Sequence, residues 1–130
     1  MNKILVEVSI GELLDKISIL EIKKEKIKDP KKLKFVFTEY LILKEQLEKN
    51  VKIDKKLEKL FQYLKDINNK LWDIEDEKRN CEKNKDFSDN FIKLSRDVHF
   101  LNDERAKIKL DINNHKGSNI KEIKEYTSYK

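Results

Sequence analysis

The sequence predicts an all-α protein made of two antiparallel helical hairpins. Three observations predict it: apolar residues recur every three or four positions along four long stretches, capping residues flank those stretches, and the 130-residue chain has only two Gly and one Pro. Charged residues form 42% of the chain, which with regular apolar spacing indicates amphipathic helices rather than disorder. We therefore expect an antiparallel four-helix arrangement whose second hairpin is the longer, after a short extended N-terminal segment.

The first hairpin follows an apolar segment, residues 3–8, that we expect to be extended. Ser9 and Glu12 fit a capping box, in which the Ser9 hydroxyl accepts an amide hydrogen and Glu12 reaches back. Asp29-Pro30 ends the first helix and starts the second. The stripes are Ile10, Leu13, Ile17, Leu20, Lys24 and Ile27 in the first helix and Leu33, Val36, Tyr40, Leu43 and Leu47 in the second.

The second hairpin has the most regular pattern. Asp54 is the predicted cap of the third helix, residues 84–86 break that helix, Ser88 caps the fourth helix and Gly117 stops it. The stripes are Leu57, Leu60, Leu64, Ile67, Leu71, Ile74, Lys78 and Cys81 in the third helix and Phe91, Leu94, Val98, Leu101, Arg105, Ile108 and Ile112 in the fourth. We expect residues 1–117 to form one helical domain and residues 118–130 a C-terminal tail.

The unequal hairpin lengths predict an overhang. At 1.5 Å per residue the second hairpin should project about 14 Å beyond the first. An apolar seam that outruns its covering helices usually meets another surface, so we expect a homodimer. The interface candidates in this overhang are Lys78, Cys81, Phe87 and Phe91.

Composition argues against several functional classes. The net charge is +5, but Lys residues alternate with Glu and Asp, whereas nucleic-acid binders usually gather basic residues on one face. No stretch reaches the 18 apolar residues of a membrane span, and Cys81 is the single cysteine, so we expect a cytoplasmic protein. No glycine-rich phosphate loop is present, and Asp73-x-x-Asp76 lacks a facing carboxylate cluster. We therefore predict no metal, cofactor or catalytic residue.

One set of polar residues is a candidate site. If the third and fourth helices fold about a turn near residue 85, polar side chains one step from the apolar seam face each other. They would either form a pocket for a small anionic ligand, walled by Trp72, or form interhelical ion pairs that fix the helix register. The candidates are Glu21, Asn68, Trp72, Glu75, Arg96, His99, Asn102 and Arg105.

Arg105 interrupts an otherwise apolar stripe. Arg occurs at three positions in a chain whose basic residues are nearly all Lys, and its forked guanidinium offers geometry that Lys cannot copy. We expect Arg105 to pair with a carboxylate such as Glu21, Asp66 or Asp103, with an anionic ligand as the alternative.

Three blocks carry a resemblance to a known family. They are residues 8–16 (Val-Ser-Ile-Gly-Glu-Leu-Leu-Asp-Lys), residues 71–76 (Leu-Trp-Asp-Ile-Glu-Asp) and residues 102–106 (Asn-Asp-Glu-Arg-Ala). In this order they resemble an uncharacterised bacterial family of short helical proteins, a domain of unknown function. The resemblance implies a bacterial origin and a self-contained domain, and it implies no catalytic residue.

These observations favour a non-enzymatic helical module for protein–protein interaction, homodimeric and with an unidentified protein partner. The alternative is binding, or modification, of a small anionic metabolite near Trp72.

Overall fold

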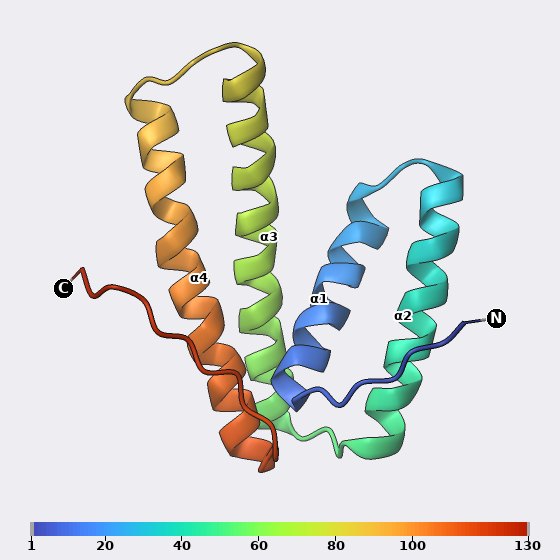
Figure 1. Ribbon diagram of the computed structural model, residues 1–130. Coiled ribbons are helices and arrows are strands. Elements are labelled where there is room, and N and C mark those ends of the chain that lie inside the picture. The colour runs from blue at the N-terminus through green and yellow to red at the C-terminus, as the bar shows by residue number, and fades with distance from the viewer. Residues whose placement is uncertain (1, 130) are drawn as a thin grey trace.

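The computed structural model describes residues 2–129 and contains four helices: α1 (Ile10–Lys26), α2 (Pro30–Asn50), α3 (Lys55–Lys83) and α4 (Asp89–Lys116) (Figure 1). No strand occurs within these residues. The prediction of an all-α fold with two antiparallel hairpins is confirmed. Residues 2–9 form an extended segment before α1.

The helix starts follow the predicted capping residues, with two differences. The side chains of Ser9, Asp29 and Asp54 accept hydrogen bonds from the first-turn amides of α1, α2 and α3. Ser88 precedes α4 without a side-chain cap bond. The prediction that Glu12 reaches back to Ser9 is wrong, because the Glu12 carboxylate instead accepts a hydrogen bond from Lys109 on α4, at 2.7 Å.

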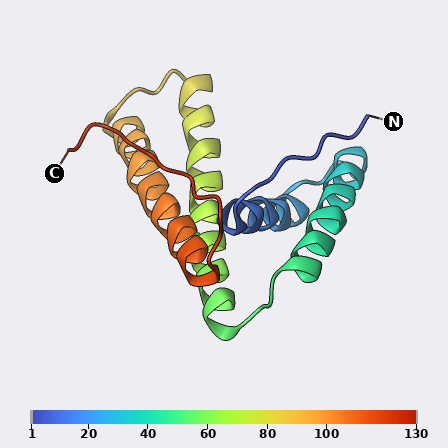
Figure 2. The ribbon, with the colours of Figure 1, turned by 60° about the horizontal axis from the view of Figure 1, so that its bottom comes forward.

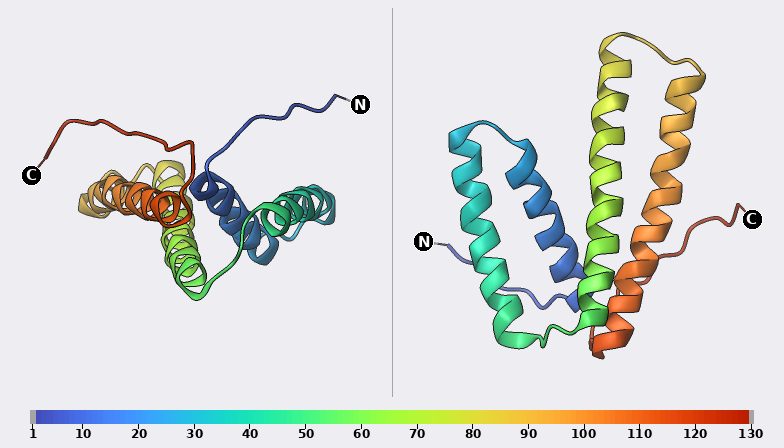
Figure 3. Two further views of the ribbon diagram at one scale, coloured as in Figure 1. Left: turned by 90° about the horizontal axis from the view of Figure 1, so that it is seen from below. Right: turned by 180° about the vertical axis from the view of Figure 1, so that it is seen from behind.

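Helix α1 joins the two hairpins. It packs against α2, α3 and α4, and α3 also packs against α4. Among the described residues, α2 contacts no helix other than α1, and the two hairpins diverge like a V (Figures 2 and 3). The arrangement therefore leaves much of α2 uncovered. The buried core comprises Leu14, Ile17, Leu47, Leu57, Leu64 and Ile112.

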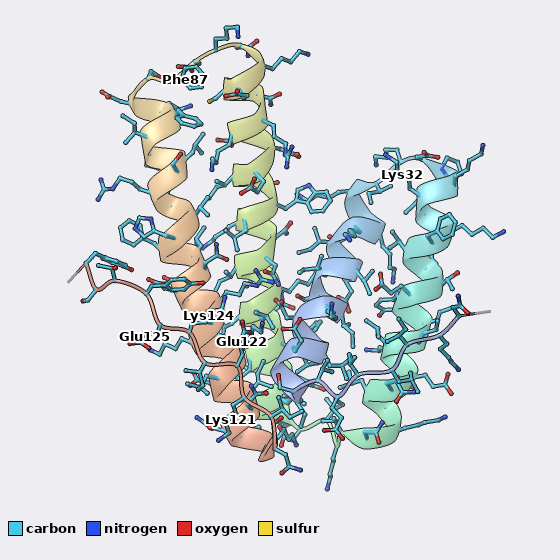
Figure 4. All side chains as sticks on the ribbon, in the orientation of Figure 1. Lys32, Phe87, Lys121, Glu122, Lys124 and Glu125 are labelled. Carbon is cyan, nitrogen blue, oxygen red and sulfur yellow. The ribbon has the colours of Figure 1, made fainter. Side chains whose placement is uncertain are left out.

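The second hairpin projects beyond the first, as predicted (Figure 1). Its helices have 29 and 28 residues, against 17 and 21 in the first hairpin. At the tip, Cys81 is buried, and the rings of Phe87 and Phe91 meet edge-on with centroids 5.4 Å apart. The Lys78 ammonium lies 6.0 Å from the centroid of Phe91. Three of the four interface candidates are thus partly covered within the chain, and Phe87 is the exposed one (Figure 4). Their role in a dimer stays a prediction.

The C-terminal tail turns back along α4. Gly117 adopts a left-handed conformation (φ 63°) and ends the helix, as predicted. Polar contacts of the tail with α4 include the hydrogen bond from Lys121 to Asn114 at 2.8 Å and that from the Tyr129 hydroxyl to Asp103. The outer limits of the predicted division into domain and tail, residues 1 and 130, lie outside the described residues, and the division stays a prediction.

Gly11 allows the start of α1 to approach the end of α4 closely. Its amide donates a hydrogen bond to the Asn113 side-chain oxygen at 2.7 Å. A Cβ atom at Gly11 would lie 2.6 Å from the Lys109 carbonyl oxygen, which belongs to the helix backbone and has little freedom to move. This position therefore requires a residue without a side chain.

We expect Gly11→Ala to lower the free energy of unfolding by about 1–3 kcal/mol, because the helices must separate. The sign is diagnostic, since Gly→Ala in an open helical position stabilises a protein by up to about 1 kcal/mol. Urea unfolding followed by circular dichroism measures the change, and Lys16→Ala at an exposed position of the same helix is the control. A Gly11→Ala variant as stable as the wild type would contradict this close approach.

Candidate functional site

The carboxylate of Asp15, on α1, is buried between the two hairpins. Only 1% of the residue is exposed. Arg105 on α4 binds it with both ends of its guanidinium: Nε lies 3.0 Å from Oδ1, and Nη2 lies 2.5 Å from Oδ2. Asn68 on α3 donates to Oδ1 at 2.8 Å and to the Ser18 hydroxyl at the same distance. One carboxylate thus connects three helices.

The polar contacts continue one turn along α4, at Lys109. Its ammonium lies 2.7 Å from Glu12 on α1, 2.9 Å from Glu122 on the tail and 3.8 Å from Asp15. The side chain of Lys109 is only 9% exposed, so these carboxylates compensate a charge held largely away from water. We call the six residues Glu12, Asp15, Ser18, Asn68, Arg105 and Lys109 the interhelical polar network.

The network fixes the charge state of its members. Burial raises the pKa of Asp15, but hydrogen bonds from Arg105 and Asn68 and the nearby positive charges outweigh it, so this pKa lies below its ordinary value. The hydrogen bonds with Asp15 raise the pKa of Arg105. Burial lowers the pKa of Lys109, but hydrogen bonds to Glu12 and Glu122 outweigh it and the pKa is raised. These side chains are held as ions that neutralise one another. This suits a role in stabilising the helix packing better than a role in proton transfer.

A second ionic cluster closes the end of the molecule where α3 begins and α4 ends. The Asp54 carboxylate lies 2.9 Å from both the His115 ring and the Lys116 ammonium. It also accepts the amide hydrogen of Leu57 as the N-cap of α3. The bond from Lys116, followed by those from Leu57 and His115, holds the pKa of Asp54 well below its ordinary value.

The structure brings together three of the predicted site residues. Asn68 and Arg105 belong to the interhelical polar network, and the Asn102 side-chain oxygen lies 3.5 Å from Nη1 of Arg105. The expectation that Arg105 pairs with a carboxylate is confirmed, but the carboxylate is that of Asp15 and not one of the three named examples, Glu21, Asp66 and Asp103. The reason is geometric: the first turns of α1 meet α4, where Gly11 contacts Asn113 and Asp15 contacts Arg105. Glu21 lies further along α1 and pairs with Lys65 on α3.

The other predicted residues lie in different places. Glu21 pairs with Lys65 at 3.2 Å and lies 3.5 Å from the Tyr40 hydroxyl. Trp72 is half-buried and Glu75 is exposed. A ligand at Trp72 stays a prediction.

Arg96 and His99 belong to an aromatic cluster on the outer side of α4. The Arg96 guanidinium lies 5.7 Å from the ring centroid of Phe100, and the His99 ring contacts both Phe100 and Tyr129. Beside this cluster, α4 and the tail enclose an open hollow of about 680 Å³. Its lining residues are Val98, His99, Asn102, Asp103, Lys124, Tyr126, Thr127 and Tyr129.

Sequence reasoning missed the central member of the network, although a signal for it exists. Asp15 lies four residues after Gly11 and three before Ser18, so the three share one face of α1 with the buried Leu14 and Ile22. A carboxylate on a face otherwise made of small and apolar residues indicates a buried acid that needs a cationic partner. Arg105, the cation that interrupts the stripe of α4, supplies it.

Residues 2–129 contain no group of three or more His, Cys, Asp or Glu side chains placed to hold a metal ion. Within the same residues, none of the helices has the length and apolar character needed to cross a membrane.

The fold and the network together define a small all-α protein, in which two helical hairpins are fastened by a buried ion pair. The chain belongs to the family described as a family of unknown function (DUF6165), which matches residues 4–129. No curated protein and no solved structure matches the chain. Two of the blocks noted in the sequence meet in the network, since one contains Glu12 and Asp15 and another contains Arg105.

We expect Arg105→Ala to lower the free energy of unfolding by about 3–5 kcal/mol, because it leaves the Asp15 carboxylate buried with its main partner removed. Arg96→Ala is the matched control: Arg96 is an exposed arginine on the same helix, and its loss should change stability by less than about 0.5 kcal/mol. Urea unfolding measures both variants. Equal losses in the two variants would contradict a special role for Arg105.

We expect acid to destabilise the fold below about pH 4. Asp15 and Asp54 have a lower pKa in the folded than in the unfolded chain, so the unfolded chain binds more protons on acidification. These two carboxylates make their full contribution to the free energy of unfolding above pH 3.8, which is their pKa in the unfolded chain. This contribution is lost as the pH falls through their lower pKa values in the folded chain. Urea midpoints from neutral to strongly acidic pH test this, and Asp15→Asn should flatten the decline. A midpoint that does not change on acidification would refute the linkage.

Proposed function

We propose that this chain is a non-enzymatic helical module for protein–protein interaction that acts as a homodimer. The observation that carries the proposal is the incomplete cover of α2, which packs against α1 alone among the described helices (Figure 2). Because no third helix covers it, α2 presents surface to which another chain can bind.

This free surface of α2 carries large apolar side chains. Phe35 is 77% exposed, Leu41 65% and Ile42 56%. Phe35 and Ile42, two turns apart, share one flank of the helix. Phe37 and Leu41, one turn apart, share another, and there the Lys24 ammonium of α1 lies 5.3 Å from the centroid of the Phe37 ring. We call the three that are more than half exposed, Phe35, Leu41 and Ile42, the α2 outer surface. Apolar side chains gathered on one exposed element indicate an interaction site rather than a random scatter.

The ion pairs of the polar candidate residues also favour protein–protein interaction over the binding of a metabolite. Arg105 and Lys109, the two cations of the interhelical polar network, are already bound to Asp15, Glu12 and Glu122. A metabolite anion would have to displace these carboxylates.

A bacterial, cytoplasmic setting is part of the proposal. The cytoplasmic part is supported by the lone Cys81, which is buried and has no second cysteine in the sequence to pair with, as suits a reducing compartment. The interleaved charges of the chain also suit a protein that binds proteins rather than nucleic acid.

We expect the full chain to have twice the monomer mass in light scattering at micromolar concentration. The double variant Phe35→Glu/Ile42→Glu should shift it towards the monomer, because two carboxylates would have to be buried in the contact. Lys31→Gln/Lys34→Gln is the control, since it changes two exposed positions of the same helix and shifts the net charge equally. A monomeric wild type would contradict the dimer, and a double variant that dimerises normally would contradict the role of the α2 outer surface.

A further inference from the structure

The N-terminal segment, residues 2–8, is extended, and its apolar side chains are largely exposed. Ile4 is 88% exposed, Leu5 85% and Val6 75%. The backbone of the segment pairs with no other described part of the chain. Most of its apolar residues are β-branched and suit strands, and an unpaired extended backbone is a template for pairing with another chain.

We propose that two copies of the chain pair through this segment as antiparallel strands centred on Leu5, an inference that rests on the homodimer proposed above. In an antiparallel pair, opposite residues have numbers with a constant sum, and here that sum is ten. Leu5 then lies opposite Leu5 of the second copy, Ile4 opposite Val6, and Lys3 opposite Glu7.

Charge complementarity selects this register. It places both lysines of the pair opposite glutamates, whereas parallel in-register pairing would place Lys3 opposite Lys3 and Glu7 opposite Glu7. A shift by one residue in either direction would put Lys3 opposite Val6 or Val8. In the proposed register one face of the ribbon carries Lys3, Leu5 and Glu7 and the other carries the apolar residues Ile4, Val6 and Val8.

The position of the segment allows two copies to pair without collision. Leu5 lies four residues before Ser9, where the helical body begins, so the two bodies would attach about 26 Å apart along the ribbon. A two-stranded ribbon alone is marginally stable in water, so its apolar face needs cover. The segment leaves the start of α1 towards the α2 side of the molecule, where the α2 outer surface offers such cover (Figures 1 and 3).

A charge-swap experiment on the full chain tests the register. Lys3→Glu alone places two carboxylates opposite each other at both ends of the ribbon, and Glu7→Lys alone places two ammonium groups there. Each variant should therefore dimerise about tenfold more weakly than the wild type. In an equimolar mixture, heterodimers should form more strongly than the homodimers of either variant. In a heterodimer each carboxylate of the first variant lies opposite an ammonium group of the second, so both repulsive contacts of a homodimer are replaced by attractive ones. Native mass spectrometry with one isotopically labelled variant counts heterodimers and homodimers. Lys28→Glu, at an exposed position outside the segment, is the control and should have no effect.

The outcomes separate this inference from the proposal on which it rests. Preferential heterodimers in the mixture support the pairing. A statistical mixture with unweakened homodimers would overturn the pairing while leaving the homodimer itself in place. A wild-type chain that stays monomeric at all accessible concentrations would overturn both.

Discussion

The buried ion pair between Asp15 and Arg105 is the interaction on which the rest of the structure depends. The apolar stripes explain why each helix needs a neighbour, but they specify poorly how one hairpin sits on the other. The buried carboxylate of Asp15 tolerates few positions, because its oxygens must meet Arg105 and Asn68 together. This requirement fixes α1 on α3 and α4 and so leaves α2 at the edge, with its outer surface free.

The four helices could be predicted because each carries its own signals. The stripe of α3 and the caps Ser9, Asp29 and Asp54 are local features, and local features set helix limits. The choice of packing partner could not be predicted in the same way. A stripe shows that a helix has a buried face, but it does not show that α2 would contact α1 alone.

The candidate site was predicted in part, for a related reason. Asn68 and Arg105 stood out as polar residues at or near apolar stripes, and they do meet. Their common partner, Asp15, was missed because the pairing was sought among other acids, whereas it is the first turns of α1 that meet α4 at Arg105. His99 and Arg96 instead contact rings outside the network, including Tyr129 of the tail, whose path along α4 no helical pattern predicts.

A double-mutant cycle on Asp15 and Arg105 tests the central claim most directly. The cycle compares the unfolding free energies of Asp15→Ala, Arg105→Ala and the double variant with that of the wild type. If the pair fastens the two hairpins, the coupling energy should be about 2 kcal/mol or more, towards the upper end found for residues in direct contact. Changes that add to within about 0.5 kcal/mol would show that the two side chains act independently and would contradict this account of the fold.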